Sequence, residues 1–144
     1  EIGAGHTVTA LYEVVSTGVK FEGPGVDELK YQQPRTTTEA ADSGELLTVE
    51  LRYKKTDADV SKRLIMAVND IGLNFDKAGK DFKFAAAVAA FGMLLRDSAF
   101  KGDATYNGVI QMARAGRGED EHGYRAEFIK LVQNARDFDD RQRE

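Results

Sequence analysis

Residues 81–98 read DFKFAAAVAAFGMLLRDS, and this stretch determines the helical half of the fold. In helical projection its apolar side chains form one stripe of Phe84, Val88, Phe91 and Leu95 and a second of Ala85, Ala89 and Met93. A helix that is apolar on nearly every side must be surrounded, so we expect it at the centre of the domain. The alanines and Gly92 let neighbouring backbones approach closely, which offsets the ~1 kcal/mol that a mid-helix glycine costs. The apolar run falls short of the ~20 residues that cross a bilayer, so direct membrane insertion is not expected.

A second helix is predicted downstream of this stretch. Asp103 supplies its N-cap, it runs through Ala115, and Gly116 and Gly118 mark its end. Its inward-facing side chains are expected to be Tyr106, Val109, Ile110 and Ala113. The apolar residues recur at helical spacing, which favours packing of one face against the first helix.

A third helix is predicted to open on the acidic run 119–121, because carboxylates complement the positive end of a helix macrodipole. Its expected core stripe comprises Tyr124, Phe128, Leu131, Val132 and Ala135. Past Asp137 the tail 138–144 is almost wholly charged, and we expect it to fray.

The strands are expected upstream, and the clearest is 47–54. There Leu47, Val49, Leu51 and Tyr53 alternate with polar residues, so one face should be buried and the other wet. A polar turn at 56–59 leads to 62–68, where the apolar residues are again in phase; this segment also fits the start of a helix. Residues 7–15 are rich in β-branched side chains and are predicted to form a further strand.

Strands before helices predict an α+β fold and not a repeating βαβ sheet. We expect a small, mostly antiparallel sheet of about three strands, followed by a three-helix cluster around the central alanine-rich helix. One domain is expected over 1–144, with a β part at 1–68 and a helical part at 77–138. Such a sheet leaves exposed edges, so an additional segment is expected to complete it. The isolated chain is expected either to form a strand-exchange dimer or to bind the N-terminal segment of a longer parent chain in trans by strand addition.

Residues 17–45 are an excursion between the first two predicted strands. They contain Gly23-Pro24-Gly25, Pro34 and three consecutive threonines, show no sustained period, and are too long for a simple hairpin connection. The excursion is either a tolerated surface insertion or a recognition loop. In the second case it would act as a lid over the sheet of a small-molecule or peptide-binding module.

Composition excludes several function classes. The chain has no cysteine, which removes disulfides, thiolate metal sites and cysteine nucleophiles. Its net charge of −4 argues against binding to a phosphate backbone, so nucleic acid is not an expected partner. We predict no cofactor.

No set of residues stands out as an active or metal site. His6 and His122 lack partners at ligand spacing, and the acidic pairs 57/59 and 139/140 lack a constrained loop of oxygen ligands. Catalytic, cofactor-binding and metal residues are therefore predicted to be none. Assembly of Ser98, His122 and Asp103 in space stays open as a hydrolase alternative.

One polar network is expected instead. Arg96-Asp97 closes the first helix and Tyr124-Arg125 opens the last, so these residues are expected to meet and dock the helices. The alternative is that the two arginines bind an anionic ligand.

Four stretches carry a resemblance to a known family: 1–14, 81–98, 101–106 and 123–132. They resemble the C-terminal domain of bacterial von Willebrand factor type A domain proteins of the YfbK type. The resemblance covers the chain except the excursion 17–45. It implies that a von Willebrand type A domain precedes this region and that the parent is a lipoprotein or a secreted protein with an extracytoplasmic address.

The resemblance brings no catalytic residues to this chain. Type A domains commonly hold Mg²⁺ through an Asp-x-Ser-x-Ser loop, which is missing here. The resemblance therefore implies a non-enzymatic accessory domain at the bacterial cell envelope, in protein–protein interaction or structural support. Its expected partners are the von Willebrand type A domain of the same chain and an unknown envelope protein.

Overall fold

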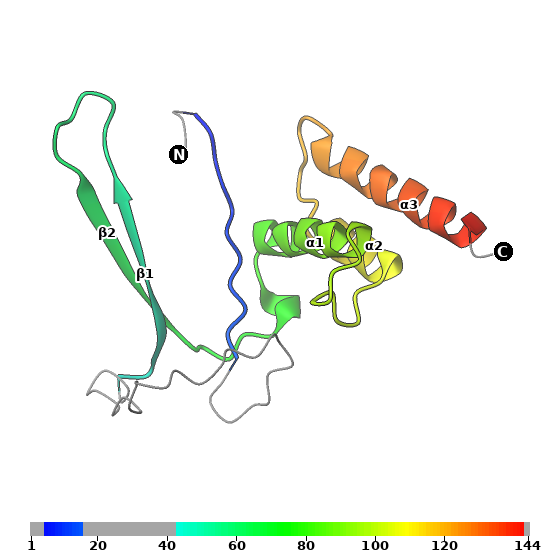
Figure 1. The fold of residues 1–144 in the computed structure, drawn as a ribbon, viewed down its shortest axis with the longest axis horizontal. Coiled ribbons are helices and arrows are strands. Elements are labelled where there is room, and N and C mark those ends of the chain that lie inside the picture. Colours follow the sequence, from blue (N-terminus) through cyan, green and yellow to red (C-terminus); the bar gives the residue numbers. More distant parts are fainter. Residues whose placement is uncertain (1–4, 16–42, 143–144) are drawn as a thin grey trace, which may run out of the picture. The chain divides into compact units, whose positions relative to one another are not determined.

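The computed structural model describes residues 5–15 and 43–142. The chain divides into two compact units, a strand unit over Val26–Asn74 and a helical unit that combines Glu1–Gly25 with Phe75–Glu144. A two-stranded antiparallel sheet precedes three helices, which confirms the α+β class (Figure 1). Most of the excursion 17–45 lies outside the described residues.

The strand unit is a hairpin of β1 (Glu45–Tyr53) and β2 (Lys62–Asn69). The predicted alternation at 47–54 is confirmed, and 62–68 forms a strand, not the start of a helix. The register places three apolar pairs on one face of the hairpin: Leu47 with Val68, Val49 with Met66, and Leu51 with Leu64. On the other face Arg63 Nη2 donates to Glu50 Oε2 at 2.6 Å.

The apolar face of the hairpin is only partly buried, contrary to the expected burial of one face: Leu47, Val49 and Val68 are half-buried and the other three residues are exposed. Leu51, Leu64 and Met66 are 55%, 50% and 58% exposed, and no side chain of β1 or β2 belongs to the buried core among the described residues. Two strands alone offer no second layer, and a third strand or a packed helix is needed to bury a sheet face.

The strand predicted at 7–15 is wrong: these residues form neither helix nor strand. Val8 and Tyr12 are 69% and 74% exposed. A β-branched composition favours a strand only where a neighbouring strand pairs with its backbone and packs its side chains. The sheet of the described residues therefore has two strands and not about three.

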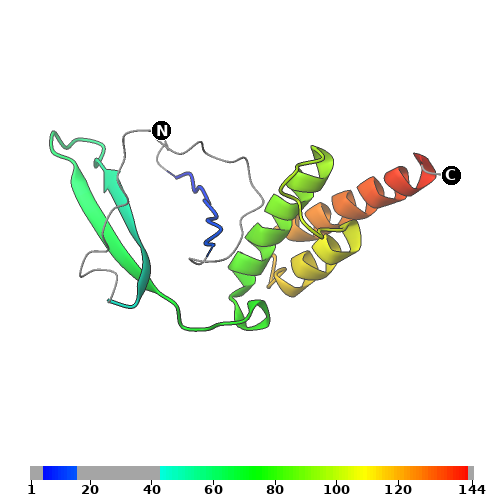
Figure 2. The ribbon, with the colours of Figure 1, turned by 60° about the horizontal axis from the view of Figure 1, so that its bottom comes forward.

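The helical unit contains a 3₁₀ turn, η2 (Phe75–Lys77), and the helices α1 (Lys80–Leu95), α2 (Tyr106–Ala115) and α3 (Tyr124–Gln142). The helices form one cluster (Figures 1 and 2). The buried apolar residues of the described part of the chain all belong to it: Ala87, Ala90, Phe91, Val109, Ile110, Ala113, Ile129 and Val132. Three rings stack edge to face across α1 and α3, with the Phe128 centroid 5.2 Å from Phe84 and 5.6 Å from Phe91.

The α1 helix is not surrounded on every side, contrary to expectation. The backbone of α2 lies close to both other helices, because short connections place sequence neighbours side by side, whereas α1 meets α3 through the rings of Phe84, Phe91 and Phe128. The outer side of α1 stays open, with Val88 43% and Leu95 60% exposed. The close backbone approach expected at Gly92 is also absent, since a Cβ there would meet nothing within 4 Å.

Gly116 is where two backbones meet. A Cβ at this position would lie 2.5 Å from the backbone nitrogen of Phe84 and 2.7 Å from the carbonyl oxygen of Lys80. The absence of a side chain therefore lets the end of α2 lie against the first turns of α1. The sequence suggested Gly116 as a helix end, which is confirmed, but gave it no packing role.

The ends of α2 and α3 differ from the predictions. Thr105 is the N-cap of α2 in place of Asp103, and its Oγ1 accepts from the Gly108 backbone N–H at 3.1 Å. The α3 helix starts after the acidic run and continues to Gln142, so the predicted fraying after Asp137 does not occur over the described residues. The backbone hydrogen bonds of the helix continue through this charged end. Charged side chains on a helix surface remain in contact with water, so they do not interrupt these bonds.

The predicted core stripe of α3 is partly wrong. Val132 is buried and Phe128 and Ala135 pack against the core, but Tyr124 and Leu131 are 72% and 55% exposed. Ile129, which was not predicted, is buried instead. Two apolar stripes run along α3, and periodicity alone did not distinguish the inner from the outer one.

Candidate functional site

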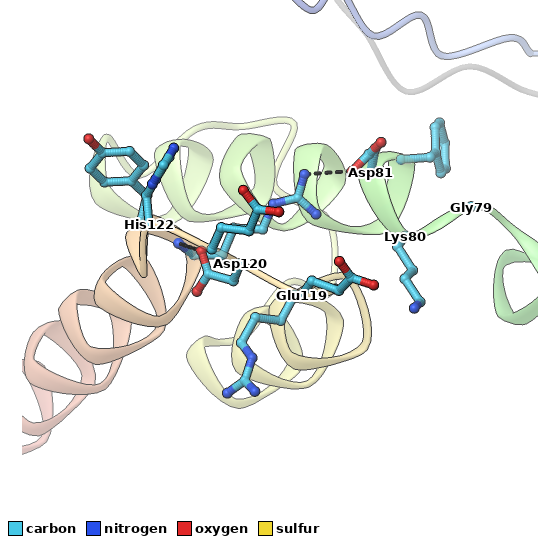
Figure 3. A pocket seen from close by; sticks show the side chains of 12 residues that line it. Gly79, Lys80, Asp81, Glu119, Asp120 and His122 are labelled. Atoms are coloured by element: carbon cyan, nitrogen blue, oxygen red, sulfur yellow. Dashed lines mark hydrogen bonds and ion pairs between the residues drawn. The ribbon is translucent and has the colours of Figure 1, made fainter.

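An open pocket of about 710 Å³ lies where the helix ends meet. It is formed by the first turn of α1, the loop before α3 and the start of α3, and Figure 3 shows Lys80 and Asp81 at the α1 end with His122 at the α3 end. Its lining holds four carboxylates and three cationic side chains: Asp81, Glu119, Asp120, Glu121, Lys80, Arg117 and Arg125. We therefore asked which of these charges remain available to a ligand.

Arg125 is committed to holding the helices together. Its Nη1 donates to the Gly116 carbonyl at 2.6 Å and its Nη2 to Asp81 Oδ1 at 2.5 Å. The guanidinium carbon lies 4.8 Å from the centroid of the Phe84 ring, within cation–π range. One side chain of α3 thus contacts the first turns of α1 and the end of α2.

The predicted docking network is confirmed for Arg125 and wrong for its partners. Arg125 pairs with Asp81 at the opposite end of α1 from Arg96 and Asp97. Asp97 forms an ion pair with Lys101, and the hydrogen bond from that ammonium lowers the pKa of Asp97. The two arginines do not come together, so they form no paired anion site.

Asp120 organises the start of α3 from the preceding loop. Its Oδ1 accepts from the Arg125 backbone N–H at 2.9 Å and its Oδ2 from that of Ala126 at 2.8 Å. The Arg125 N–H bond is the main cause that lowers the pKa of Asp120, with partial desolvation opposing it. The predicted stabilisation of this helix end by acidic residues is thus confirmed for Asp120, although it acts from four residues outside the helix.

The structure does not bring Ser98, His122 and Asp103 together, as the hydrolase alternative requires. Ser98 follows the C-terminal end of α1, whereas His122 lines the pocket at the N-terminal end, so α1 with its ~24 Å length separates them. Asp103 lines a different pocket beside η2. No serine, threonine or cysteine lines the pocket that contains His122, and His6 is an exposed residue of the segment 5–15.

Over residues 5–15 and 43–142 no group of three or more histidine, aspartate and glutamate side chains is arranged to hold a metal ion. The carboxylates at 57 and 59 belong to the hairpin loop, and those at 139 and 140 to α3. None of the helices in this part of the chain is long and apolar enough to span a bilayer.

With these contacts established, the chain can be compared with known proteins. The family described as "Uncharacterized protein YfbK, C-terminal" matches residues 1–138. The chain belongs to this family. A YfbK relative from Escherichia coli K12, described as "Uncharacterized protein YfbK", is 32% identical over 135 residues.

The comparison with that relative also defines what this domain is part of. The aligned stretch covers 94% of this chain and 22% of the E. coli YfbK protein, so the chain spans about a fifth of its relative's length. No solved structure matches the chain. The resemblance inferred from the sequence is thus confirmed at the level of the YfbK C-terminal domain.

Sequence reasoning missed two residues that join the helix ends around the pocket. Asp81 was treated only as the start of a helix, and Gly116 only as the end of one. Asp81 lies in the first turn of α1 and Arg125 in the first turn of α3. Their ion pair could be predicted only from knowledge that these two helix ends lie close together. Of the charged residues that line the pocket, Asp81, Asp120 and Arg125 hold the helix ends together.

Proposed function

We propose that this YfbK C-terminal domain is a non-enzymatic accessory domain that docks onto the von Willebrand type A domain of the same polypeptide. The apolar face of the β1–β2 hairpin carries the proposal, because half of its residues are exposed. That face consists of Leu47, Val49, Leu51, Leu64, Met66 and Val68, and we refer to it below as the hairpin face. Docking through it would support protein–protein interaction at the bacterial cell envelope.

The energetic argument rests on the hairpin by itself. An isolated two-stranded hairpin is marginally stable in water, and β1 and β2 add no side chain to the buried core of the described residues. Leu51, Leu64 and Met66 are each about half exposed, so covering them contributes about 1 kcal/mol apiece. A partner that covers the hairpin face therefore stabilises the hairpin and gains a specific interface.

The rest of the polypeptide is a suitable partner. The chain covers 22% of its E. coli relative, so most of a YfbK-type protein lies outside it. The resemblance described above implies that a von Willebrand type A domain is part of that remainder. A domain on the same polypeptide is present at high effective concentration, so even a modest apolar interface stays formed.

Hydrogen exchange of the full-length YfbK-type protein tests the docking. Amides of β1 and β2 should exchange at least tenfold more slowly in the full-length protein than in the 144-residue chain, because covering the hairpin face suppresses local opening. Met66→Lys in the full-length protein should abolish that difference. Equal protection of the hairpin in the two proteins would show that nothing covers this face.

Ile65→Lys is the matched control. Ile65 is 54% exposed against 58% for Met66, it is the next residue of β2, and its side chain points to the opposite face. The lysine at 65 should leave the protection of β1 and β2 unchanged. If both lysine variants lose protection equally, the hairpin has simply been destabilised and the proposed orientation is wrong.

The envelope location has its own test. The full-length protein should fractionate with the cell envelope, and cross-linking there should capture the same envelope proteins with the wild type and Ile65→Lys but fewer with Met66→Lys. Recovery of the full-length protein in the cytoplasmic fraction would contradict this part of the proposal.

A further inference from the structure

The outer side of α3 carries an apolar line that the fold does not use. Tyr124, Leu131 and Phe138 recur at intervals of seven residues and are 72%, 55% and 62% exposed. Seven residues are close to two helical turns, so the three side chains lie almost in line along the helix. The buried residues Ile129 and Val132 occupy the side that faces α1 and α2. We call the exposed line the α3 stripe.

The α3 stripe borders a hollow of about 400 Å³. Tyr124 and Leu131 line it together with Phe128, which is partly buried against the core. At the other end of the stripe Phe138 is 62% exposed, so the apolar line continues along the C-terminal part of α3. The 19 residues of α3 make the helix ~28 Å long.

The charges beside the α3 stripe identify its occupant. Glu127, Asn134 and Arg141 also recur at intervals of seven, on one flank of the stripe, with the acid near the start of α3 and the base near its end. A second α3 in antiparallel orientation would set Glu127 of each copy opposite Arg141 of the other. A parallel copy would set Glu127 against Glu127, which is unfavourable.

We infer that two copies of this chain pair through antiparallel α3 helices, with Leu131 of each copy against Phe138 of the other and the two Glu127–Arg141 pairs at the rim. The arrangement is self-complementary, as a two-fold interface requires. The central Asn134 is neutral and lies near the axis, so neither copy opposes a like charge there. The inference uses residues of α3 alone and does not rest on docking of the hairpin face.

Sedimentation equilibrium of the 144-residue chain tests the pairing. The wild type should show a concentration-dependent dimer, and Leu131→Glu should weaken dimerisation by about a hundredfold, because it places a carboxylate in the centre of the apolar contact. Leu95→Glu is the matched control: Leu95 is 60% exposed on α1, and its substitution should leave the dimer intact. Circular dichroism should show equal helix content for both variants.

A charge exchange tests the orientation. Glu127→Arg and Arg141→Glu alone should each weaken dimerisation about tenfold, because two attractive pairs become repulsive. The double variant E127R/R141E should recover the wild-type constant, and a mixture of the two single variants should form a heterodimer, since each supplies the charge that the other lacks.

Several results would overturn the inference. A wild-type chain that is monomeric at millimolar concentration has no such interface. A dimer that persists in Leu131→Glu uses another surface, for example the edges of the hairpin. A double variant no better than the single ones excludes the antiparallel arrangement.

Discussion

Gly116 is the position at which one added methyl group should destabilise the domain most. A Cβ there would lie 2.5 Å from the Phe84 nitrogen, 2.7 Å from the Lys80 carbonyl oxygen and 2.9 Å from the Phe84 Cα. Optimal carbon contacts are roughly 3.5 to 4.0 Å, so Gly116→Ala must push α1 and α2 apart by about 1 Å. All three atoms are helix backbone and cannot rotate away as a side chain would.

The expected loss follows from three contributions. Overpacking of a core typically costs about 1 to 3 kcal/mol. The displacement also stretches the 2.6 Å hydrogen bond from Arg125 to the Gly116 carbonyl, worth about 1.5 kcal/mol for a charged donor. Against these, the backbone angles of φ −94° and ψ −1° suit any residue, so alanine gains about 0.4 to 1 kcal/mol by restricting the unfolded chain. We expect a net loss of about 2 to 3 kcal/mol in the free energy of unfolding.

Urea unfolding followed by far-ultraviolet circular dichroism measures this loss, because the signal is dominated by the helices. Gly92→Ala is the control: it lies inside α1 with nothing within 4 Å of its Cβ, so it should stabilise by about 0.5 to 1 kcal/mol. The two alanine variants should thus shift the urea midpoint in opposite directions. Shifts in the same direction, or a Gly116→Ala variant as stable as the wild type, would refute the proposed backbone contact.

The remaining predictions concern the helix caps. Thr105→Ala removes the N-cap of α2 and should reduce the free energy of unfolding by about 1 kcal/mol. Asp103→Ala should change it by less than about 0.5 kcal/mol. Urea titration of both variants decides which residue caps α2. Asp120 has a lowered folded-state pKa, so its stabilising contribution is present above the unfolded value of ~3.9 and is lost as pH falls through the folded value. Asp120→Asn keeps only one acceptor for the Arg125 and Ala126 N–H groups, so it should be less stable than the wild type at pH 6. The gap between their urea midpoints should narrow below about pH 4, and a gap that does not depend on pH would contradict this account.

Features set by local pattern were predictable from the sequence. Alternation at 47–54 and 62–68 identified both strands, and the run 81–98 identified α1 to within a few residues. Features that depend on a partner were not. The segment 7–15 has the composition of a strand but has no pairing neighbour in the described residues, and composition cannot supply the missing hydrogen bonds.

The candidate site was likewise predictable where it depends on local sequence pattern and not where it depends on contacts between helices. Arg125 was identified as a docking residue because an arginine at a helix start is a noticeable signal, but its partner is Asp81 and not Asp97. That choice depends on which ends of the helices converge, which one sequence does not reveal. Gly92 and Gly116 illustrate the same limit, since both are small and only the packing shows which one touches a neighbouring backbone.

Most close backbone contacts within each unit join elements that follow one another in the sequence: β1 with β2, α1 with α2, and α2 with α3. Side chains connect α1 with α3, through the Asp81–Arg125 pair and the Phe84, Phe91 and Phe128 rings. Such a low contact order favours rapid folding, so each unit should acquire its structure soon after its own residues are synthesised. The proposed covering of the hairpin face requires a partner and comes later. Among residues 5–15 and 43–142 no further strand pairs with β1 or β2, so in that interval the hairpin presents open edges beside an apolar surface, an arrangement that promotes aggregation. A YfbK-type protein from which the von Willebrand type A domain has been deleted should therefore be lost to aggregation or proteolysis, and its level in the cell should fall below that of the intact protein.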